Sequence, residues 1–306
     1  MSRAWALALL AAGAGCSPSA EAKSPEILEI ERLAFVPTGQ CVFWPGFGTR
    51  VVCANARPLL VDRFEVTRAD WRAWCERASP PQDPAFTAWL AAWGPETSDW
   101  PATFMTLAEA RAFAAWRGMR LPTAREWMRL ACGTDERPYD YPWGGARRVS
   151  VANTLELELG NPLPVGTFEQ GRTSLSVYDM AGNVWEWVED PIATPSSEAP
   201  PGLAWAMGGS YLSNLRRLYD TRKGLAFLEE DLDPAARSND VGLRCCADAA
   251  QFLWSHAGSW SAERAREKLL AVGASWGRDA VPLLEELAGR PGAPPSLPVL
   301  LDGARR

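Results

Sequence analysis

Histidine is almost absent from this chain of 306 residues, which holds a single one, His256. A His₃ zinc site or a two-histidine iron centre is therefore impossible. A Ser-His-Asp triad would have to use His256, which lies in a late and peripheral-looking segment. Basic residues are outnumbered, with 31 Lys+Arg against 37 Asp+Glu and a net charge of −6. Nucleic-acid binding requires a basic face, so we expect no nucleic-acid partner.

A long apolar run is missing as well. The chain begins Met-Ser-Arg, continues with apolar residues from Ala4 to Gly15, and reaches Cys16. This run is too short to span a bilayer as a helix, and the pattern is typical of a signal peptide over residues 1–16. Gly-Ala-Gly-Cys16 resembles a bacterial lipobox, although Gly13 stands where a large aliphatic residue is usual. The resemblance implies a lipid on the Cys16 sulfur and a polar tether over 17–33, with simple secretion as the alternative.

Six of the seven cysteines lie beyond Cys16: Cys41, Cys53, Cys75, Cys132, Cys245 and Cys246. An even number in an exported chain suggests disulfides, but their connectivity does not follow from the sequence. Cys41 and Cys53 lie near enough to close a local loop. Buried free thiols are the alternative for each residue.

Sixteen tryptophans indicate a core held by aromatic side chains and loops rather than by long aliphatic strands. We expect a short hairpin over Leu33–Arg50, a strand over Pro58–Thr67 and a Pro-rich loop over 79–102. Helices are expected to begin at three threonines, each suited to cap a helix: Thr67, Thr106 and Thr123.

The pattern changes at Ala249, where helical periodicity begins. Apolar residues recur over Ser261–Val272 and again over Arg278–Ala288, before Pro-Gly and Pro-Pro interrupt the pattern. We therefore expect residues 249–306 to form a helical hairpin. One such unit cannot bury its own apolar face, so it should pack on the main domain or on a partner.

Five short motifs follow one another between these regions. They are Arg120-Leu-Pro-Thr-Ala-Arg-Glu-Trp127, Tyr141-Pro-Trp-Gly144, Val177-Tyr-Asp-Met-Ala-Gly-Asn-Val-Trp-Glu-Trp187, Met207-Gly-Gly-Ser-Tyr211 and Val241-Gly-Leu-Arg-Cys245. In this order they resemble the sulfatase-modifying-factor family, the formylglycine-generating-enzyme-like domains, over about residues 34–248. The resemblance implies an irregular α+β fold akin to C-type lectins.

The generating enzyme of this family oxidises a peptide cysteine to formylglycine with O₂ and with copper held by two cysteines. The resemblance places those cysteines at the second and seventh positions after Tyr211, where this chain has Ser213 and Leu218. A hydroxyl and an isobutyl group cannot replace two thiolates around Cu(I), so copper is not expected. Ser210 matches an active-site serine of the family that does not bind the copper. The iron enzymes of the family need histidines, which this chain lacks too.

Calcium is the metal that the resemblance still implies. The matching positions are Asp179 and Glu186 by side chain, and Gly182 and Val184 by backbone carbonyl. Ca²⁺ binds six to eight hard oxygens and mixes carboxylates with carbonyls, so these groups suit it. The alternative is a purely structural turn in which Asp179 makes local hydrogen bonds.

The resemblance also bears on the cysteines. Cys245 stands where the family often has a disulfide cysteine, whose partner lies on the helix after Glu126. This chain has Cys132 there, displaced by one position, so Cys245 or Cys246 is its expected partner. Vicinal Cys245 and Cys246 could instead hold Cu(I) or act in redox chemistry.

Together these features favour a lipid-anchored protein of the bacterial cell envelope, or a periplasmic or secreted one. We expect it to bind or support an envelope protein or a glycan and not to act as an enzyme. The alternative function is a sulfatase-activating oxidoreductase with relocated metal ligands. A subunit of a surface or motility complex is a third, compatible with the helices of 249–306.

Overall fold

The structure is a computed structural model that describes residues 27–43, 51–80, 83–133, 141–144, 148–190, 202–215 and 229–306. The expected signal peptide, Cys16 and Leu218 lie outside the described residues. Within the described ranges, no helix is long and apolar enough to cross a membrane.

The strands of the described residues form three small sheets. One is antiparallel, in the order β1 (Leu33–Val36), β4 (Leu59–Asp62) and β9 (Cys246–Asp248). A second pairs β2 (Gly39–Phe43) with β3 (Val51–Asn55). The third has the order β7 (Glu229–Leu232), β6 (Ala204–Met207), β5 (Trp185–Trp187) and β8 (Val241–Leu243), with β5 and β8 parallel.

The hairpin expected over Leu33–Arg50 is not formed as such. All four residues of β1 are buried, so β1 joins the interior sheet beside β4 instead of folding back on β2. β2 pairs with β3, which begins beyond Arg50. The expected strand over Pro58–Thr67 is confirmed in its first half, as β4.

The three expected helix starts are confirmed, and each carries a capping box. Thr67 precedes α2 (Arg68–Ala78), Thr106 precedes α4 (Leu107–Trp116) and Thr123 precedes α5 (Ala124–Cys132). In each helix the threonine oxygen accepts the N–H of the third helical residue, whose carboxylate accepts the threonine N–H in return. A four-residue helix, α1 (Ile27–Ile30), comes before β1.

The Pro-rich segment 79–102 is not only loop. It contains α3 (Pro84–Ala91), because Asp83 caps the helix and Pro84 takes its first position, where no N–H is needed. Single turns of 3₁₀-helix lie at Pro95–Thr97, Val149–Val151, Leu155–Leu157, Glu169–Gly171, Ala257–Ser259 and Arg278–Ala280.

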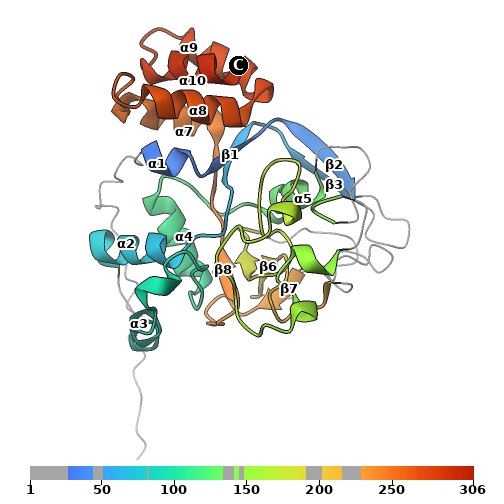
Figure 1. The fold of residues 1–306 in the computed structure, drawn as a ribbon. Coiled ribbons are helices and arrows are strands. Elements are labelled where there is room, and N and C mark those ends of the chain that lie inside the picture. Colours follow the sequence, from blue (N-terminus) through green and yellow to red (C-terminus); the bar gives the residue numbers. More distant parts are fainter. Residues whose placement is uncertain are drawn as a thin grey trace, which may run out of the picture.

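Aromatic side chains fill the centre, as the composition predicts. Trp71 stacks on Phe113 at 5.2 Å between ring centroids, and Trp74 meets both rings edge-on. Trp127, Trp187 and Trp205 are among the largest fully buried side chains. Helices α2, α3 and α4 gather on one side of the molecule, and the β5–β8 sheet with its loops lies on the other (Figure 1).

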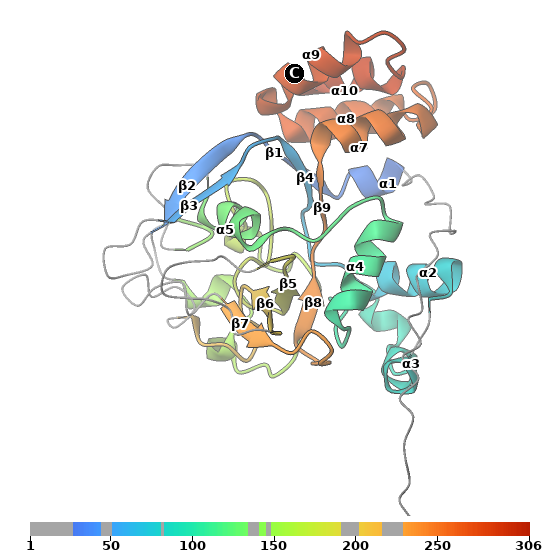
Figure 2. The ribbon, with the colours of Figure 1, turned by 180° about the vertical axis from the view of Figure 1, so that it is seen from behind.

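The C-terminal segment contains more than the two expected helices. Its helices are α7 (Ala249–His256), α8 (Arg266–Trp276), α9 (Val281–Ala288) and α10 (Ser296–Ala304). They stack above β1 at one end of the molecule (Figure 2). The indole of Trp276 donates a 2.9 Å hydrogen bond to the carbonyl of Leu33, so this extension packs on the main domain, as expected.

Candidate functional site

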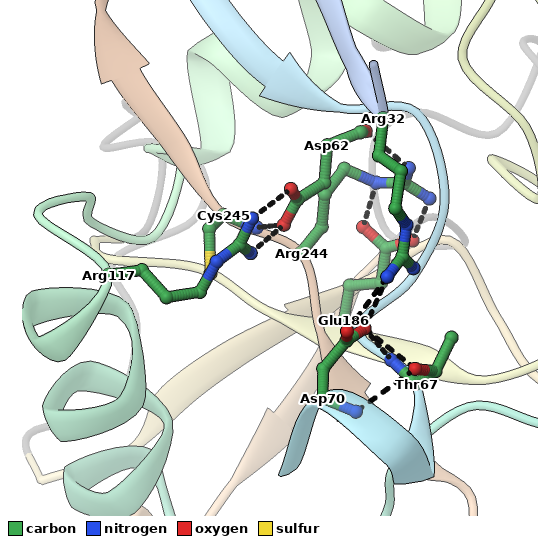
Figure 3. Close-up of polar contacts among 8 residues, drawn as sticks. All are labelled: Arg32, Asp62, Thr67, Asp70, Arg117, Glu186, Arg244 and Cys245. Atoms are coloured by element: carbon green, nitrogen blue, oxygen red, sulfur yellow. Dashed lines mark hydrogen bonds and ion pairs between the residues drawn. The ribbon is translucent and has the colours of Figure 1, made fainter. Parts of the chain in front are cut away.

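A buried ion pair lies at the centre of the β5–β8 sheet. Glu186 is the middle residue of β5, and Arg244 follows β8, which runs parallel beside it. Arg244 Nη2 lies 2.6 Å from Glu186 Oε1, and Arg244 Nε lies 3.0 Å from Oε2 (Figure 3). The two side chains are 0% and 1% exposed. Trp127 Nε1 donates a third hydrogen bond to Oε2 at 2.7 Å, so both carboxylate oxygens are occupied.

The same guanidinium connects several elements. Arg244 also donates to the backbone carbonyls of Asp62 and Tyr178. The Asp62 carboxylate in turn accepts two hydrogen bonds from Arg117, at 2.7 and 2.9 Å, and one from the backbone N–H of Cys245. Figure 3 shows these groups side by side. Their burial and full pairing indicate a structural role for Arg244.

Two more carboxylates lie near this pair. Glu65 Oε1 accepts the backbone N–H of Val184 at 3.1 Å, and Glu65 Oε2 accepts an N–H of the Asn183 side chain. Burial, and then the charges of Asp179 and Glu186, raise the pKa of Glu65 well above its usual range. Burial raises the pKa of Asp179 to about 6, although the Gly166 N–H at 2.6 Å and Arg244 oppose this shift.

The segment expected to bind calcium, residues 179–186, is held by Arg244, which bonds to Glu186 and to the carbonyl of the preceding Tyr178. Gly182 makes the tight turn: its φ is 81°, and a Cβ there would lie 2.1 Å from the Asn153 carbonyl oxygen. The oxygens of Glu186 face N–H donors and a cation, which does not fit a calcium ion at that side chain. Among the described residues, no three His, Cys, Asp or Glu are grouped to hold a metal ion. Calcium stays a prediction, and the contacts of Glu186 argue against that residue's part in it.

The segment that matches the copper site begins where β6 ends. Ser210 is fully buried, and its hydroxyl donates to Asp240 Oδ2 at 2.8 Å. The backbone N–H of Ser210 donates to Ser213 Oγ at 2.9 Å, and the Ser213 N–H donates to the Ser210 carbonyl. The hydroxyl at the first copper-cysteine position therefore closes a local turn.

Two acidic side chains from elsewhere in the chain, Asp240 and Glu156, form hydrogen bonds with this segment. Asp240 holds the hydroxyls of Ser210 and Ser238. Glu156 accepts the backbone N–H of Leu215 at 3.1 Å from each carboxylate oxygen. Both lie outside the quoted motifs, so sequence reasoning missed them. Glu65 was missed too, and its only signal was an acid between the apolar Phe64 and Val66.

The cysteines do not lie as the resemblance implied. Helix α5 packs on β2 and β3, so Cys132 at its end meets Cys41 and not Cys245 or Cys246. Cys245 lies beside Asp62 and Arg117, and Cys246 beside Arg120, whose Nη1 is 3.2 Å from its sulfur. All six described cysteines are free, and these neighbours argue against the expected pairing of Cys132 with either residue, which stays a prediction.

Cys245 and Cys246 do not form a site together either. Both are fully buried, and burial raises the pKa of each thiol. Cu(I) binds thiolates, and a raised pKa disfavours that form. These surroundings argue against Cys245 and Cys246 as relocated copper ligands.

Comparison with known families decides what this fold is. The model of the sulfatase-modifying factor enzyme 1-like domain matches residues 23–249. The chain belongs to this family. The expected family and the α+β fold class are thereby confirmed, and the match is close to the predicted limits of 34–248.

Named relatives of this family member differ in activity. Hercynine oxygenase of Mycolicibacterium thermoresistibile is 33% identical over 159 residues, 43% of this chain and 35% of that protein. The inactive C-alpha-formylglycine-generating enzyme 2 of Bos taurus is 29% identical over 168 residues, 51% of this chain and 53% of its own. The formylglycine-generating enzyme of Mycobacterium tuberculosis is 26% identical over 248 residues, 67% of this chain and 76% of its own. The chain spans about a third of the hercynine oxygenase it matches.

Solved structures support the fold. PvdO from Pseudomonas aeruginosa superposes with a TM-score of 0.54 at 20% identity, over 71% of this chain and 94% of its own. Treponema denticola variable protein 1 gives 0.52 at 15% identity, over the same shares of the two chains. At these identities the likeness is one of fold alone.

Proposed function

We propose that this protein is a non-catalytic member of its family, exported and anchored through a lipid on Cys16, that binds or supports a partner in the bacterial cell envelope. One observation carries the proposal. The first copper-cysteine position is Ser213, whose hydroxyl accepts the Ser210 N–H at 2.9 Å. The second is Leu218, which has no ligand atom.

Three further facts support this proposal. A single histidine leaves no three-histidine set for iron chemistry. Cys245 and Cys246 have thiols whose pKa is raised by burial. The inactive C-alpha-formylglycine-generating enzyme 2 of Bos taurus also matches half of this chain. The scaffold therefore persists while the thiol pair is absent, which favours binding over oxidation.

The decisive experiment is an oxidation assay on the full chain. The protein is loaded with Cu(I) and incubated with O₂ and a Cys-x-Pro-x-Arg peptide, and the peptide is weighed by mass spectrometry. We expect an unchanged peptide mass, beside full conversion by an active formylglycine-generating enzyme. Formylglycine in the peptide would overturn the non-catalytic proposal and establish the oxidoreductase alternative.

The anchor is tested separately in bacterial cells. We expect the wild-type chain in the detergent phase of a Triton X-114 partition and the Cys16→Ala variant in the aqueous phase, because several acyl chains hold a protein at a membrane. Ser17→Ala is the matched control and should partition like the wild type. A Cys16→Ala chain that stays in the detergent phase would contradict lipidation at this residue.

A further inference from the structure

Three cysteines that are distant in sequence meet under the β2–β3 sheet. Cys41 on β2 and Cys53 on β3 are direct partners in the antiparallel register. Cys132 is the last residue of α5, which packs against both strands. The three side chains are 0%, 0% and 4% exposed. None of them takes part in the turn at Ser210 and Ser213.

Cys41 is the centre of this group, which we call the thiol cluster (Cys41, Cys53 and Cys132). Cys53 and Cys132 lie close enough to Cys41 to influence its ionisation, and the Cys41 sulfur lies 4.0 Å from the carbonyl oxygen of Met128. The buried guanidinium of Arg129 lies nearby and favours a negative charge there. These contacts lower the pKa of Cys41 to about 4, and the same contacts raise the pKa of Cys53 and of Cys132. Cys41 is therefore the thiol of the cluster that loses its proton most readily.

Backbone geometry permits a bond across the strands. Directly opposed residues of an antiparallel pair have Cα atoms about 4.5 or 5.5 Å apart, depending on their hydrogen bonding. Disulfides span about 4.4–6.8 Å between Cα atoms. Cys41 and Cys53 meet this condition by their register, and the packing of α5 on both strands places Cys132 near Cys41.

We propose that the thiol cluster is an exchangeable disulfide site, in which Cys41 is bonded either to Cys53 or to Cys132. A disulfide of a small thiol, RSSR, is the oxidant. A transient local opening of the thiol cluster admits it, because these sulfurs are buried in the closed fold. The Cys41 thiolate attacks it and releases one RS⁻. Cys53 or Cys132 gives its proton to that RS⁻, and the resulting thiolate attacks the Cys41 sulfur and releases the second. One protein disulfide forms, and two RSH leave with the two protons.

Exchange within the thiol cluster needs no further oxidant. The Cys132 thiolate attacks the sulfur of Cys41, the bond from Cys41 to Cys53 breaks, and Cys53 leaves with the electron pair and takes up the proton. The two states differ mechanically. A bond from Cys41 to Cys53 closes the β2–β3 sheet on itself, whereas a bond from Cys41 to Cys132 ties that sheet to α5.

The test is a disulfide map of the full chain after equilibration in glutathione buffers of increasing oxidised fraction. Acid quenching, alkylation at low pH in denaturant and peptide mass spectrometry read out each link. For the wild type we expect one disulfide per chain, always with Cys41. The Cys53→Ala variant should form only the link to Cys132, and Cys132→Ala only the link to Cys53. Far-UV circular dichroism verifies that each variant is folded.

Two variants complete the test. Cys41→Ala should form no link between Cys53 and Cys132 at any glutathione ratio that oxidises the wild type. Cys75→Ala, outside the thiol cluster, should give the wild-type map. Three alkylated thiols at every ratio, a link between Cys53 and Cys132, or a link from Cys132 to Cys245 or Cys246 would each overturn the proposal. These outcomes are independent of the formylglycine assay, which involves none of these cysteines.

Discussion

In the interior, three carboxyl groups lie near a single guanidinium, so the acidic side chains outnumber the basic one. The charge of Arg244 acts on Glu65, Asp179 and Glu186. Arg244, Glu65 and Glu186 are fully buried, and Asp179 is half-buried. Glu186 takes the direct ion pair, and Trp127 completes its hydrogen bonding. A buried pair of this kind is costly to break, because removal of one partner leaves an uncompensated charge.

Replacement of Glu186 by Gln tests this balance. Gln keeps the shape but removes the charge that offsets Arg244, so we expect unfolding to become easier by about 3–5 kcal/mol. Urea denaturation measures the change. The control is Glu286→Gln, which breaks an exposed pair with Arg290 and should change stability by less than about 1 kcal/mol. Equal effects of the two variants would show that the buried pair is not the stronger one.

Asp70 gives a pH dependence of known sign. Burial works against its charge, but Arg32, whose Nη1 lies 2.8 and 2.9 Å from the two oxygens, and the Thr67 hydroxyl lower its pKa. A lowered carboxyl pKa contributes stability that is fully present above the unfolded value of about 3.9 and is lost as pH falls through the folded value.

Replacement of Asp70 by Asn should therefore lower the melting temperature by a constant amount between pH 7 and about pH 5. The deficit should shrink as the pH falls toward 3, because Asp70 is then protonated in the unfolded wild-type chain before it is protonated in the folded one. Melting curves of both proteins across this range measure the difference. A deficit that is unchanged at pH 3 would assign the loss to the capping geometry at Thr67 and not to charge.

Elements were predictable where a local signal decides them. Thr67, Thr106 and Thr123 begin helices because side chain and backbone within four residues satisfy one another. Elements that depend on distant partners were not. β1 pairs with β4 because both strands are fully buried, and nothing within 33–50 encodes that choice. Ser296–Ala304 forms α10 despite the two prolines before it, because its apolar face covers α8.

Close packing of α8 and α10 gives a prediction at this scale. A Cβ at Gly303 would lie 2.3 Å from the carbonyl oxygen of Leu270, which a helix backbone cannot easily move. Gly303→Ala should therefore destabilise the protein by about 1–3 kcal/mol in urea, although alanine favours helices. The control is Gly258→Ala, where the nearest atom is 4.0 Å away, and it should cost little. A neutral Gly303→Ala would mean that the two helices can separate without loss.

At the scale of the whole molecule, β1 near the start of the described chain contacts β4 and the C-terminal helix α8. The sheet β1-β4-β9 contains strands from both ends of the matched domain, and α8 covers β1. Besides the hydrogen bond of Trp276 to Leu33, the ring of Trp276 lies 6.1 Å from that of Phe35. We therefore expect the domain and its helical extension to unfold in one cooperative transition.

Trp276→Ala should lower the stability of the entire chain by about 3–5 kcal/mol and keep a single transition in differential scanning calorimetry. Trp254→Ala is the matched control in the same extension, because Trp254 is 38% exposed. It should have a clearly smaller effect. Two separate transitions in either variant would mean that the extension folds independently.

Sequence reasoning captured the family, because the resemblance depends on residues within continuous motifs. The absence of copper chemistry rests on the same kind of motif and stays a prediction. The positions of Ser213 and Leu218 after Tyr211 were enough to align them with the copper-binding cysteines of the family. Sequence reasoning did not find Glu65 beside Arg244, or Cys132 beside Cys41, because these contacts depend on how α5 and β4 pack against other elements. The neighbours of Cys132 argue against its expected disulfide for the same reason, because a position on a helix does not say which surface that helix faces.

The packing of Trp276 against β1 has a consequence for biosynthesis. β1 is made early, but its cover is made only when α8 leaves the ribosome. Until then the apolar residues of β1 lack their final neighbours on the side that α8 covers. Contacts of such long sequence separation also slow folding. The order of synthesis thus delays completion of the fold until Trp276 has been added.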